Sequence, residues 1–153
     1  MKSILIAVDD TKGSKAAFGF CTNVCRCMLP EKIVLLYVER FEGRSLMTDM
    51  LPVSELSTLK EVIEGTEYKE AMDKRADEIL GYYRKALEDN AVSSIKTVKK
   101  IGNPAEEILN TAREEAAEMI IIGSRGRRVG HLFMGSVSRE VANSSEIPVL
   151  VVK

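Results

Sequence analysis

The sequence predicts an α/β fold: one doubly wound sheet of five mainly parallel strands, in the order 3-2-1-4-5, with helices on both faces. Three observations lead to this prediction. Short, continuous apolar runs recur along the chain, which is typical of strands buried in a parallel sheet. Amphipathic helical segments separate these runs. Glycine, proline and asparagine stand at the junctions, where they favour turns.

The first predicted unit is a strand, a helix and a second strand. Residues 3–8 (SILIAV) and 32–38 (KIVLLYV) are the strands. Ser14 is the predicted N-cap of the helix between them, which extends to about residue 28, and Pro30 ends it. Two strands joined through one helix are expected to be parallel, with a right-handed crossover.

An insertion is predicted at about 40–66, where the pattern loosens. Met47 and Met50 belong to a set of apolar residues with near-helical spacing. The segment is interpreted as a long crossover with one or two helical turns. A cap on the sheet edge, a lid over a ligand and a surface for a partner are the alternatives.

The second half alternates helices and strands. A helix is predicted from 67 to about 90 and a strand at 94–101, where lysines alternate with apolar residues as in a strand near a sheet edge. Asn103 and Pro104 suit the start of a helix over 105–118. A strand at 119–122, a helix from 136 to about 144 and a strand at 149–152 complete the order.

The length, charge and apolar runs of the chain limit the classes of protein to which it can belong. Its 153 residues have the length of one domain, so we expect 1–153 to form a single unit. The 22 basic and 23 acidic residues nearly cancel, which argues against nucleic acid as a partner. No apolar run is long enough to span a membrane, and the first residues lead into a strand rather than a signal peptide. We therefore expect a cytoplasmic protein.

Three cysteines lie close together in the first helix. Cys21 and Cys25 are four residues apart on its apolar face, which favours buried thiols that pack as small hydrophobic groups. Cys27 lies off that face, and we expect it to be exposed and open to oxidation. A zinc or redox site is the alternative, but the spacing and the lack of nearby histidines argue against a metal.

The segment 123–136 is the strongest candidate for a ligand site. It contains four glycines and precedes a helix, so backbone N–H groups and the positive end of a helix dipole are available to an anion. The spacing of Gly123 and Gly126 does not match the dinucleotide fingerprint. Gly130 and Gly135 have the spacing of a P-loop, but Ser136 stands where the P-loop has its lysine. A plain turn is the alternative interpretation. Basic side chains in the segment would balance a negative ligand: Arg125, Arg127, Arg128 and His131.

The predicted topology favours a site over a plain turn. In a doubly wound sheet, ligands bind beyond the carboxyl ends of the strands, where the strand order reverses. Asp9 follows the first strand, Val38 ends the second, and the glycine segment follows the fourth. All three are expected at one edge of the sheet.

Five segments carry a resemblance to a known family: ILIAVDD at 4–10, IVLLYVE at 33–39, GNPAEEIL at 102–109, MIIIGSRG at 119–126 and GSVSREVANSSEIPVLVV at 135–152. Together they resemble the universal stress protein family over essentially the whole chain. The resemblance implies a cytoplasmic α/β protein that is usually a homodimer joined through its final strand. It also implies membership either of a branch that binds ATP or of a branch that lacks the nucleotide motif.

The ATP-binding branch has the pattern G-x2-G-x9-G-[ST]. Gly123 and Gly126 match its start, and Gly135 and Ser136 match its end. Eight residues rather than nine separate Gly126 from Gly135 in this chain. Gly130 is able to absorb the difference through a backbone conformation that other residues avoid.

The resemblance implies ATP or a related adenine nucleotide as ligand, with Mg²⁺ when a triphosphate is bound. Asp9 and the backbone of Ala7 and Val38 would contact the adenosine part. Arg125 stands where relatives often have histidine, and it keeps the positive charge there. The residues implied at the phosphate end are Gly123, Arg125, Gly126, Gly135, Ser136 and Val137.

Asp9 and Ser136 each have a structural alternative. Asp9 is an acceptor for a ribose hydroxyl or an adenine amine, or else it stabilises a turn or caps a helix. Ser136 donates to a phosphate oxygen or caps the last helix, and these two roles can coexist. No residue is an evident nucleophile or general base, and the lone His131 is typical of a solvated side chain. Any ATP hydrolysis is therefore expected to be slow and incidental.

The expected function is that of an adenine-nucleotide-binding, homodimeric regulatory protein of the stress response. Residues 148–152 are apolar and predicted to lie at a sheet edge, where a second copy of the chain is expected to pair. The alternative is a nucleotide-independent dimer that binds a partner or acts as a chaperone, which the short spacer and the insertion with Met47 and Met50 favour. Both hypotheses include a protein partner that the sequence does not identify.

Overall fold

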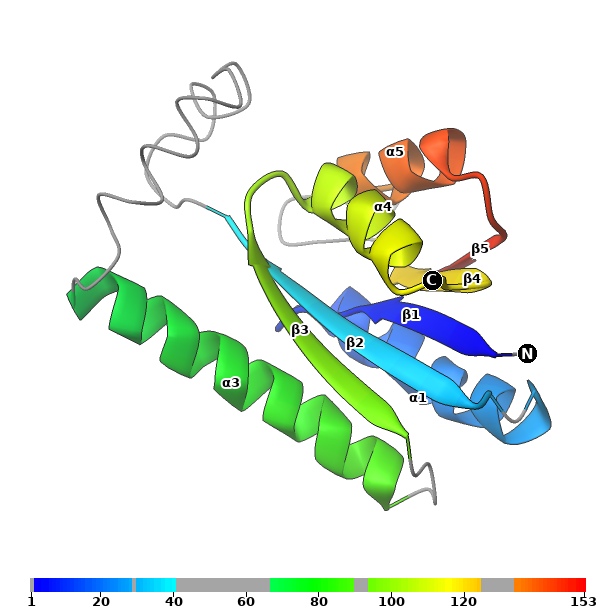
Figure 1. Ribbon diagram of the computed structural model, residues 1–153, viewed down its shortest axis with the longest axis horizontal. Coiled ribbons are helices and arrows are strands. Elements are labelled where there is room, and N and C mark those ends of the chain that lie inside the picture. Colours follow the sequence, from blue (N-terminus) through cyan, green and yellow to red (C-terminus); the bar gives the residue numbers. More distant parts are fainter. Residues whose placement is uncertain (1, 29, 41–66, 90–93, 125–133) are drawn as a thin grey trace.

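The structure, a computed structural model, describes residues 2–28, 30–40, 67–89, 94–124 and 134–153. Strands and helices alternate along these residues (Figure 1). The predicted insertion at about 40–66 lies almost wholly outside them. In chain order the elements are β1 (Ser3–Ala7), α1 (Lys12–Met28), β2 (Lys32–Glu39), α3 (Glu67–Glu88), β3 (Ile95–Ile101), α4 (Pro104–Glu114), β4 (Met119–Gly123), α5 (Ser136–Ser144) and β5 (Val149–Val152).

The strands form one sheet in the order β3-β2-β1-β4-β5. Every neighbouring pair is parallel, so the predicted order is confirmed and the predicted parallel pairing holds throughout. Ile4 in β1 is opposite Ile33 of β2 on one side and Met119 of β4 on the other. The strand order therefore reverses between β1 and β4, which is the point where doubly wound sheets hold ligands.

Helices cover both faces of the sheet (Figure 1), and on each face an apolar layer lies between the helices and the strands. Alternate residues of each strand face opposite layers, because successive side chains of a strand point to opposite faces. Ile4 and Ile6 belong to the layer under α1 and α3, and Leu5 belongs to the layer under α4 and α5. All three side chains are fully buried or nearly so. This burial explains why the central strands lack alternating polar residues.

The predicted burial of Cys21 and the predicted exposure of Cys27 are confirmed, and the side chain of Cys25 lies outside the described residues. Cys21 is fully buried against the layer that includes Phe18 and Ile4, and Cys27 is exposed near the end of α1. No helix among the described residues is both long and apolar enough to cross a membrane.

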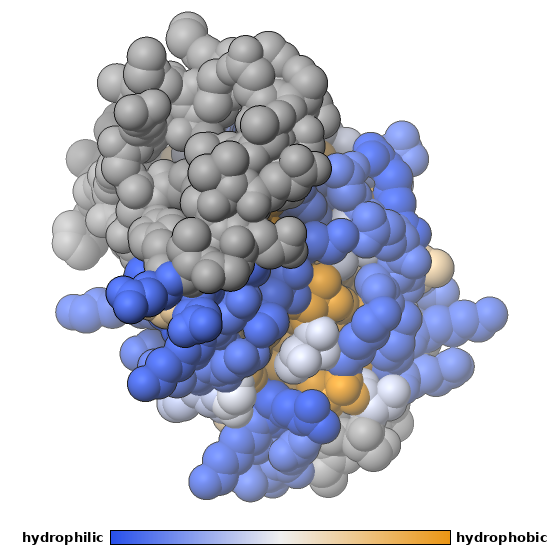
Figure 2. Space-filling view, turned by 60° about the vertical axis from the view of Figure 1, so that its left-hand side comes forward, coloured by the Kyte–Doolittle hydropathy of each residue, from blue (hydrophilic) through white to orange (hydrophobic). Residues whose placement is uncertain are grey.

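The two edge strands of the sheet differ in chemistry. Along β3, Lys96, Lys99 and Lys100 make ion pairs with acidic residues of α3 and of α4 or the turn that follows it. Edge lysines of this kind oppose pairing with another chain. Figure 2 shows this side of the molecule as mainly hydrophilic, with a narrow hydrophobic strip. The edge at β5 instead consists of four half-buried aliphatic residues.

The helix α4 begins as predicted and ends earlier than predicted. Asn103 caps it, since its Oδ1 accepts a hydrogen bond from Ala105 N at 3.0 Å, and Pro104 is the first helical residue. The predicted end at 118 is wrong, because Ala116 has a φ of 48° and breaks the helical path. Ala117 N then donates to Ala112 O at 2.9 Å, which satisfies a carbonyl at the helix end.

Replacing Ala116 by glycine is expected to raise the free energy of unfolding by about 1 kcal/mol, because a left-handed φ strains a residue with a Cβ. Ala71→Gly is the control: Ala71 is exposed inside α3, where glycine should lower stability by about 1 kcal/mol. Urea denaturation measures both changes. A loss of stability in Ala116→Gly similar to that in Ala71→Gly would contradict this conformation.

Candidate functional site

The predicted site residues that the structure describes lie at the carboxyl edge of the sheet, on β1, β2 and β4, in the turn after β1 and at the start of α5. Ala7 is the last residue of β1 and pairs with Leu36 and Ile122 on its two sides. Val38 is the residue before the end of β2, and Gly123 ends β4. Three neighbouring strands thus direct these positions to one edge. Arg125 and Gly126 lie outside the described residues.

The turn after β1 is built on hydrogen bonds to the side chain of Asp9. Its Oδ1 accepts from Thr11 N at 2.8 Å and from the Thr11 hydroxyl. Thr11 Oγ1 in turn accepts from Ser14 N at 3.2 Å, which caps α1. The prediction that Ser14 is the N-cap is therefore wrong. Ser14 lies within the first turn of α1, and its Oγ accepts a hydrogen bond from Asp9 N at 2.9 Å.

The second carboxylate oxygen of Asp9 remains available for a ligand. Among the described residues, Oδ2 has no hydrogen-bond partner, and Asp9 is only half-buried. The alternative prediction, that Asp9 stabilises a turn, is thus confirmed for its Oδ1 oxygen. A half-buried carboxylate oxygen beside the strand-order reversal is a suitable acceptor for a hydroxyl or amine donor.

Gly123 has a structural reason to be glycine. A Cβ built there would lie 2.9 Å from the carbonyl carbon and oxygen of Gly13, in the first turn of α1. Backbone therefore passes directly against backbone at this point. This close approach brings the start of the glycine segment next to the turn that carries Asp9.

The base of the segment between β4 and α5 is closed by hydrogen bonds to Ser124. Gly135 N donates to Ser124 O at 2.7 Å. The buried Ser138 hydroxyl lies 3.1 Å from the same oxygen and 3.0 Å from Gly135 O, so it reinforces this closure. The Gly135 amide is thus used within the chain. Sequence reasoning did not find Ser138, because a buried serine in a short helix carries no distinctive pattern.

The first amides of α5 have no hydrogen-bond partner among the described residues. Arg139 N to Gly135 O, at 3.1 Å, is the bond that opens the helical ladder. The N–H groups of Ser136, Val137 and Ser138 precede it and have no acceptor inside the helix. Gly135 occupies the N-cap position without a side-chain cap, so the N-cap alternative for Ser136 is wrong. These N–H groups and the helix dipole favour an anion at this end.

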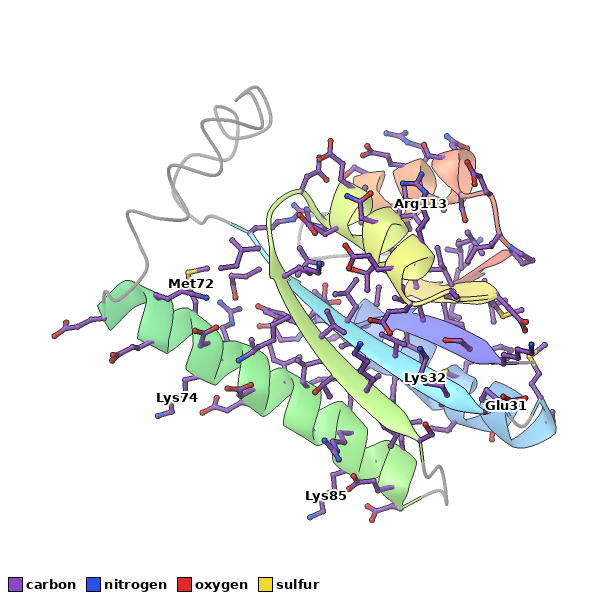
Figure 3. The ribbon with its side chains drawn as sticks, viewed as in Figure 1. Glu31, Lys32, Met72, Lys74, Lys85 and Arg113 are labelled. Carbon is purple, nitrogen blue, oxygen red and sulfur yellow. The ribbon has the colours of Figure 1, made fainter. Side chains whose placement is uncertain are left out.

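The opposite edge of the sheet is closed by ion pairs. Glu115 accepts a hydrogen bond from Lys96 at 2.6 Å and pairs with Lys32 at 3.1 Å. Figure 3 shows Lys32 at the start of β2, far along the strand from the site. The hydrogen bond from Lys96 holds the pKa of the Glu115 carboxyl below its ordinary value of 4.5. Charged groups at this edge already satisfy one another.

A shallow groove of about 120 Å³ also lies near that opposite edge. Leu109 and Ala112 of α4, Ile120 of β4 and Ile147 before β5 contribute to its mainly apolar lining. Arg113, Ser145 and Glu146 also line the groove, but it lies at the amino ends of β4 and β5, away from the carboxyl edge where doubly wound sheets bind their ligands. We therefore place the candidate site between Asp9 and the start of α5, where a ligand with a hydrogen-bond donor at one end and negative charge at the other fits the chemistry.

Comparison with known proteins gives the family. The model of the universal stress protein family matches residues 1–153. The chain belongs to the universal stress protein family. Universal stress protein MJ0577 of Methanocaldococcus jannaschii is 30% identical over 156 residues, which cover 99% of this chain and 94% of the relative. The solved structure of MJ0577 matches with a TM-score of 0.77 at 27% identity, over 99% of this chain and 95% of that one.

Two other members of the universal stress protein family share the fold at 18% identity. The Arabidopsis thaliana protein At3g01520, solved with AMP bound, has a TM-score of 0.68 over 100% of this chain and 92% of its own. The Archaeoglobus fulgidus protein, solved in complex with dAMP, has a TM-score of 0.60 over 100% and 98%. The predicted family and fold are both confirmed.

The contact at Gly123 generates a prediction for this universal stress protein. Gly123→Ala should lower the free energy of unfolding by about 1–3 kcal/mol, because backbone atoms of Gly13 block the added methyl group. Gly81→Ala is the control, since Gly81 lies in α3 with open space around it, and should raise stability by about 0.5–1 kcal/mol. Thermal and urea denaturation test both. Wild-type stability in Gly123→Ala would disprove the close approach.

Proposed function

We propose that this protein binds an adenine nucleotide at the carboxyl edge of its sheet, between β1 and β4, and acts as a homodimeric, cytoplasmic regulatory protein of the stress response. One observation carries the proposal. Asp9 Oδ2, an acceptor without a partner among the described residues, and the first amides of α5 follow the two strands that flank the reversal of strand order. A nucleoside phosphate offers the matching groups, a donor at one end and an anion at the other.

In the proposed complex, the adenosine part lies on β1 and β2. Asp9 accepts from a ribose hydroxyl or the adenine amine, and the backbone of Ala7 and Val38 lines this end. Ala7, the last residue of β1, and Val38, the residue before the end of β2, are half-buried, so part of each stays accessible to a ligand. The solved relatives with AMP and dAMP support an adenine nucleotide as the ligand class.

The phosphate end lies at α5. The amides of Ser136 and Val137 and the exposed Ser136 side chain would donate to phosphate oxygens. Gly123 allows the backbone after β4 to pass close to the first turn of α1. Gly135 donates its N–H to Ser124 O and so joins the two ends of the glycine segment. Arg125 and Gly126, outside the described residues, complete the proposed set. ATP is the proposed physiological nucleotide, and Mg²⁺ would accompany it by screening the charge of the triphosphate.

Regulation rather than catalysis is the proposed outcome of binding. The groups at the described part of the site are an acidic acceptor, hydroxyls and amides, which bind and orient a ligand. The competing hypothesis is a nucleotide-independent dimer that serves a protein partner. It depends on the eight-residue spacer and the insertion, of which only Met134 and Arg40 belong to the described residues.

The Asp9→Asn variant tests nucleotide binding. Asparagine keeps an oxygen for Thr11 N but replaces the acceptor Oδ2 by a donor amide, so we expect affinity for ATP to fall about 10- to 100-fold. Asp89→Asn is the control: Asp89 is an exposed carboxylate just after the end of α3, so this variant should bind ATP like the wild type. Titration calorimetry measures each affinity. Absence of binding to ATP, ADP and AMP at millimolar concentration in the wild type would refute the proposal.

The homodimer is proposed to form through β5. Pro148 O and Val152 O accept from Ile120 N and Ser124 N, at 2.9 and 2.6 Å, so these positions face β4. The intervening Val149 and Val151 direct their main-chain groups to the other side, where no further strand of the described residues lies. A second copy would satisfy these groups and cover the half-buried valines.

Val151→Pro is expected to convert the dimer to a monomer, because proline removes the outward N–H and spares the bonds to β4. Val151→Ala keeps that N–H and should remain dimeric. Light scattering coupled to size-exclusion chromatography gives the molecular mass. A dimeric Val151→Pro variant that is folded by circular dichroism would show that the interface lies elsewhere.

A further inference from the structure

The side chain of Tyr83 in α3 reaches across the core to the turn that carries Asp9. It is 1% exposed, and its ring packs against Phe18 of α1 with the centroids 4.7 Å apart. Its hydroxyl lies 2.8 Å from Asp9 O and 3.2 Å from Ser14 Oγ. Tyr83 is 74 positions from Asp9 in the sequence, yet its hydroxyl makes a polar contact at the candidate site.

Tyr83 and Ser14 together hold both main-chain polar groups of Asp9. The Asp9 N–H donates to Ser14 Oγ at 2.9 Å, and the Asp9 carbonyl accepts from the Tyr83 hydroxyl. The Ser14 and Tyr83 hydroxyls are also within hydrogen-bond distance, which closes a ring of three residues. Such a ring fixes the direction in which the Asp9 side chain leaves the backbone.

The Tyr83 hydroxyl is a permanent donor in this ring. Burial, the largest cause, raises the pKa of the Tyr83 phenol above its ordinary value of 10.0. The hydroxyl therefore keeps its proton at physiological pH. A carbonyl oxygen only accepts, so the hydroxyl must donate to Asp9 O for that contact to be a hydrogen bond.

A second contact ties α3 to the same turn. Arg75 Nη2 lies 2.8 Å from Asp10 Oδ2, two helical turns before Tyr83 along α3. Figure 3 shows Lys74 and Lys85 of α3 pointing away from the sheet, so the helix directs a separate face to the turn. The position of α3 and the position of Asp9 are therefore mechanically linked.

We propose that Tyr83 is a positioning residue of the nucleotide site: its hydroxyl fixes the main chain of Asp9 and so aims the Asp9 carboxylate at the adenosine part of the ligand. The inference rests on the proposed function and adds a regulatory consequence to it. Binding free energies couple reciprocally. A nucleotide that requires Asp9 in this orientation therefore also stabilises the contacts of α3 with the turn.

Tyr83→Phe tests the inference, since phenylalanine keeps the ring on Phe18 and removes only the hydroxyl. Calorimetry is performed with ATP, with 2′,3′-dideoxy-ATP, which lacks the ribose hydroxyls, and with ITP, which lacks the adenine amine. We expect ATP to bind about five- to twentyfold more weakly than to the wild type. One of the two analogues lacks the group that Asp9 contacts. For that analogue, the affinities of Tyr83→Phe and of the wild type should differ by less than about twofold. Asp9→Asn should likewise bind that same analogue nearly as well as the wild type does.

Two further variants separate positioning from folding. Tyr82→Phe is the matched control, because Tyr82 is the neighbouring residue, is 60% exposed, and packs against Tyr83 with its ring. It should bind all three ligands like the wild type. Ser14→Ala removes the other hydroxyl of the ring and should reproduce the ligand-selective loss, which keeps the test open if Tyr83→Phe is poorly folded. Circular dichroism monitors the fold of each variant.

The outcomes are distinct. Wild-type affinity in Tyr83→Phe, or an equal loss for all three ligands, overturns the positioning role and leaves the proposed function intact. A wild-type protein that binds none of the three overturns both. A loss for ATP that is absent for one analogue supports the inference.

Discussion

The hydrogen bond from Asp9 N–H to Ser14 Oγ is the contact on which the geometry of the site depends. It joins the end of β1 to the first turn of α1, so the chain leaves the sheet in one defined direction. The Asp9 carboxylate is then divided between two tasks, with one oxygen stabilising the turn and the other left without a partner among the described residues. An acceptor in this state at a strand-order reversal is the basis of the proposed nucleotide site.

The two edges of the sheet have opposite characters. At the amino edge, Lys32 and Lys96 both pair with Glu115, so the charges there satisfy one another within the chain. At the carboxyl edge, the close approach at Gly123 and the bond from Gly135 N to Ser124 O fix two backbone segments while leaving the next amides of α5 without helical acceptors. The charges of one edge are therefore paired within the chain, and the other edge carries the groups on which the proposed nucleotide site depends.

The sequence predicts the fold well because burial on both faces of a parallel sheet requires unbroken apolar runs such as that around Ile4 and Ile33. It predicts local capping less well. Thr11 and Ser14 both carry cap-forming hydroxyls, and only the observed bonds distinguish their roles. The left-handed Ala116 has no glycine to signal it, and the contact of Tyr83 with Asp9 spans 74 positions, beyond any local pattern.

The central claim is that a single ligand bridges the Asp9 turn and the start of α5. Titration of the ¹⁵N-labelled protein with ATP, followed by amide NMR, measures this most directly. The account predicts that the signals of Asp9, Ser136, Val137 and Ser138 shift together with one dissociation constant. Shifts confined to the groove near Leu109 and Ile147, or no shifts at these four amides at millimolar ATP, would contradict it.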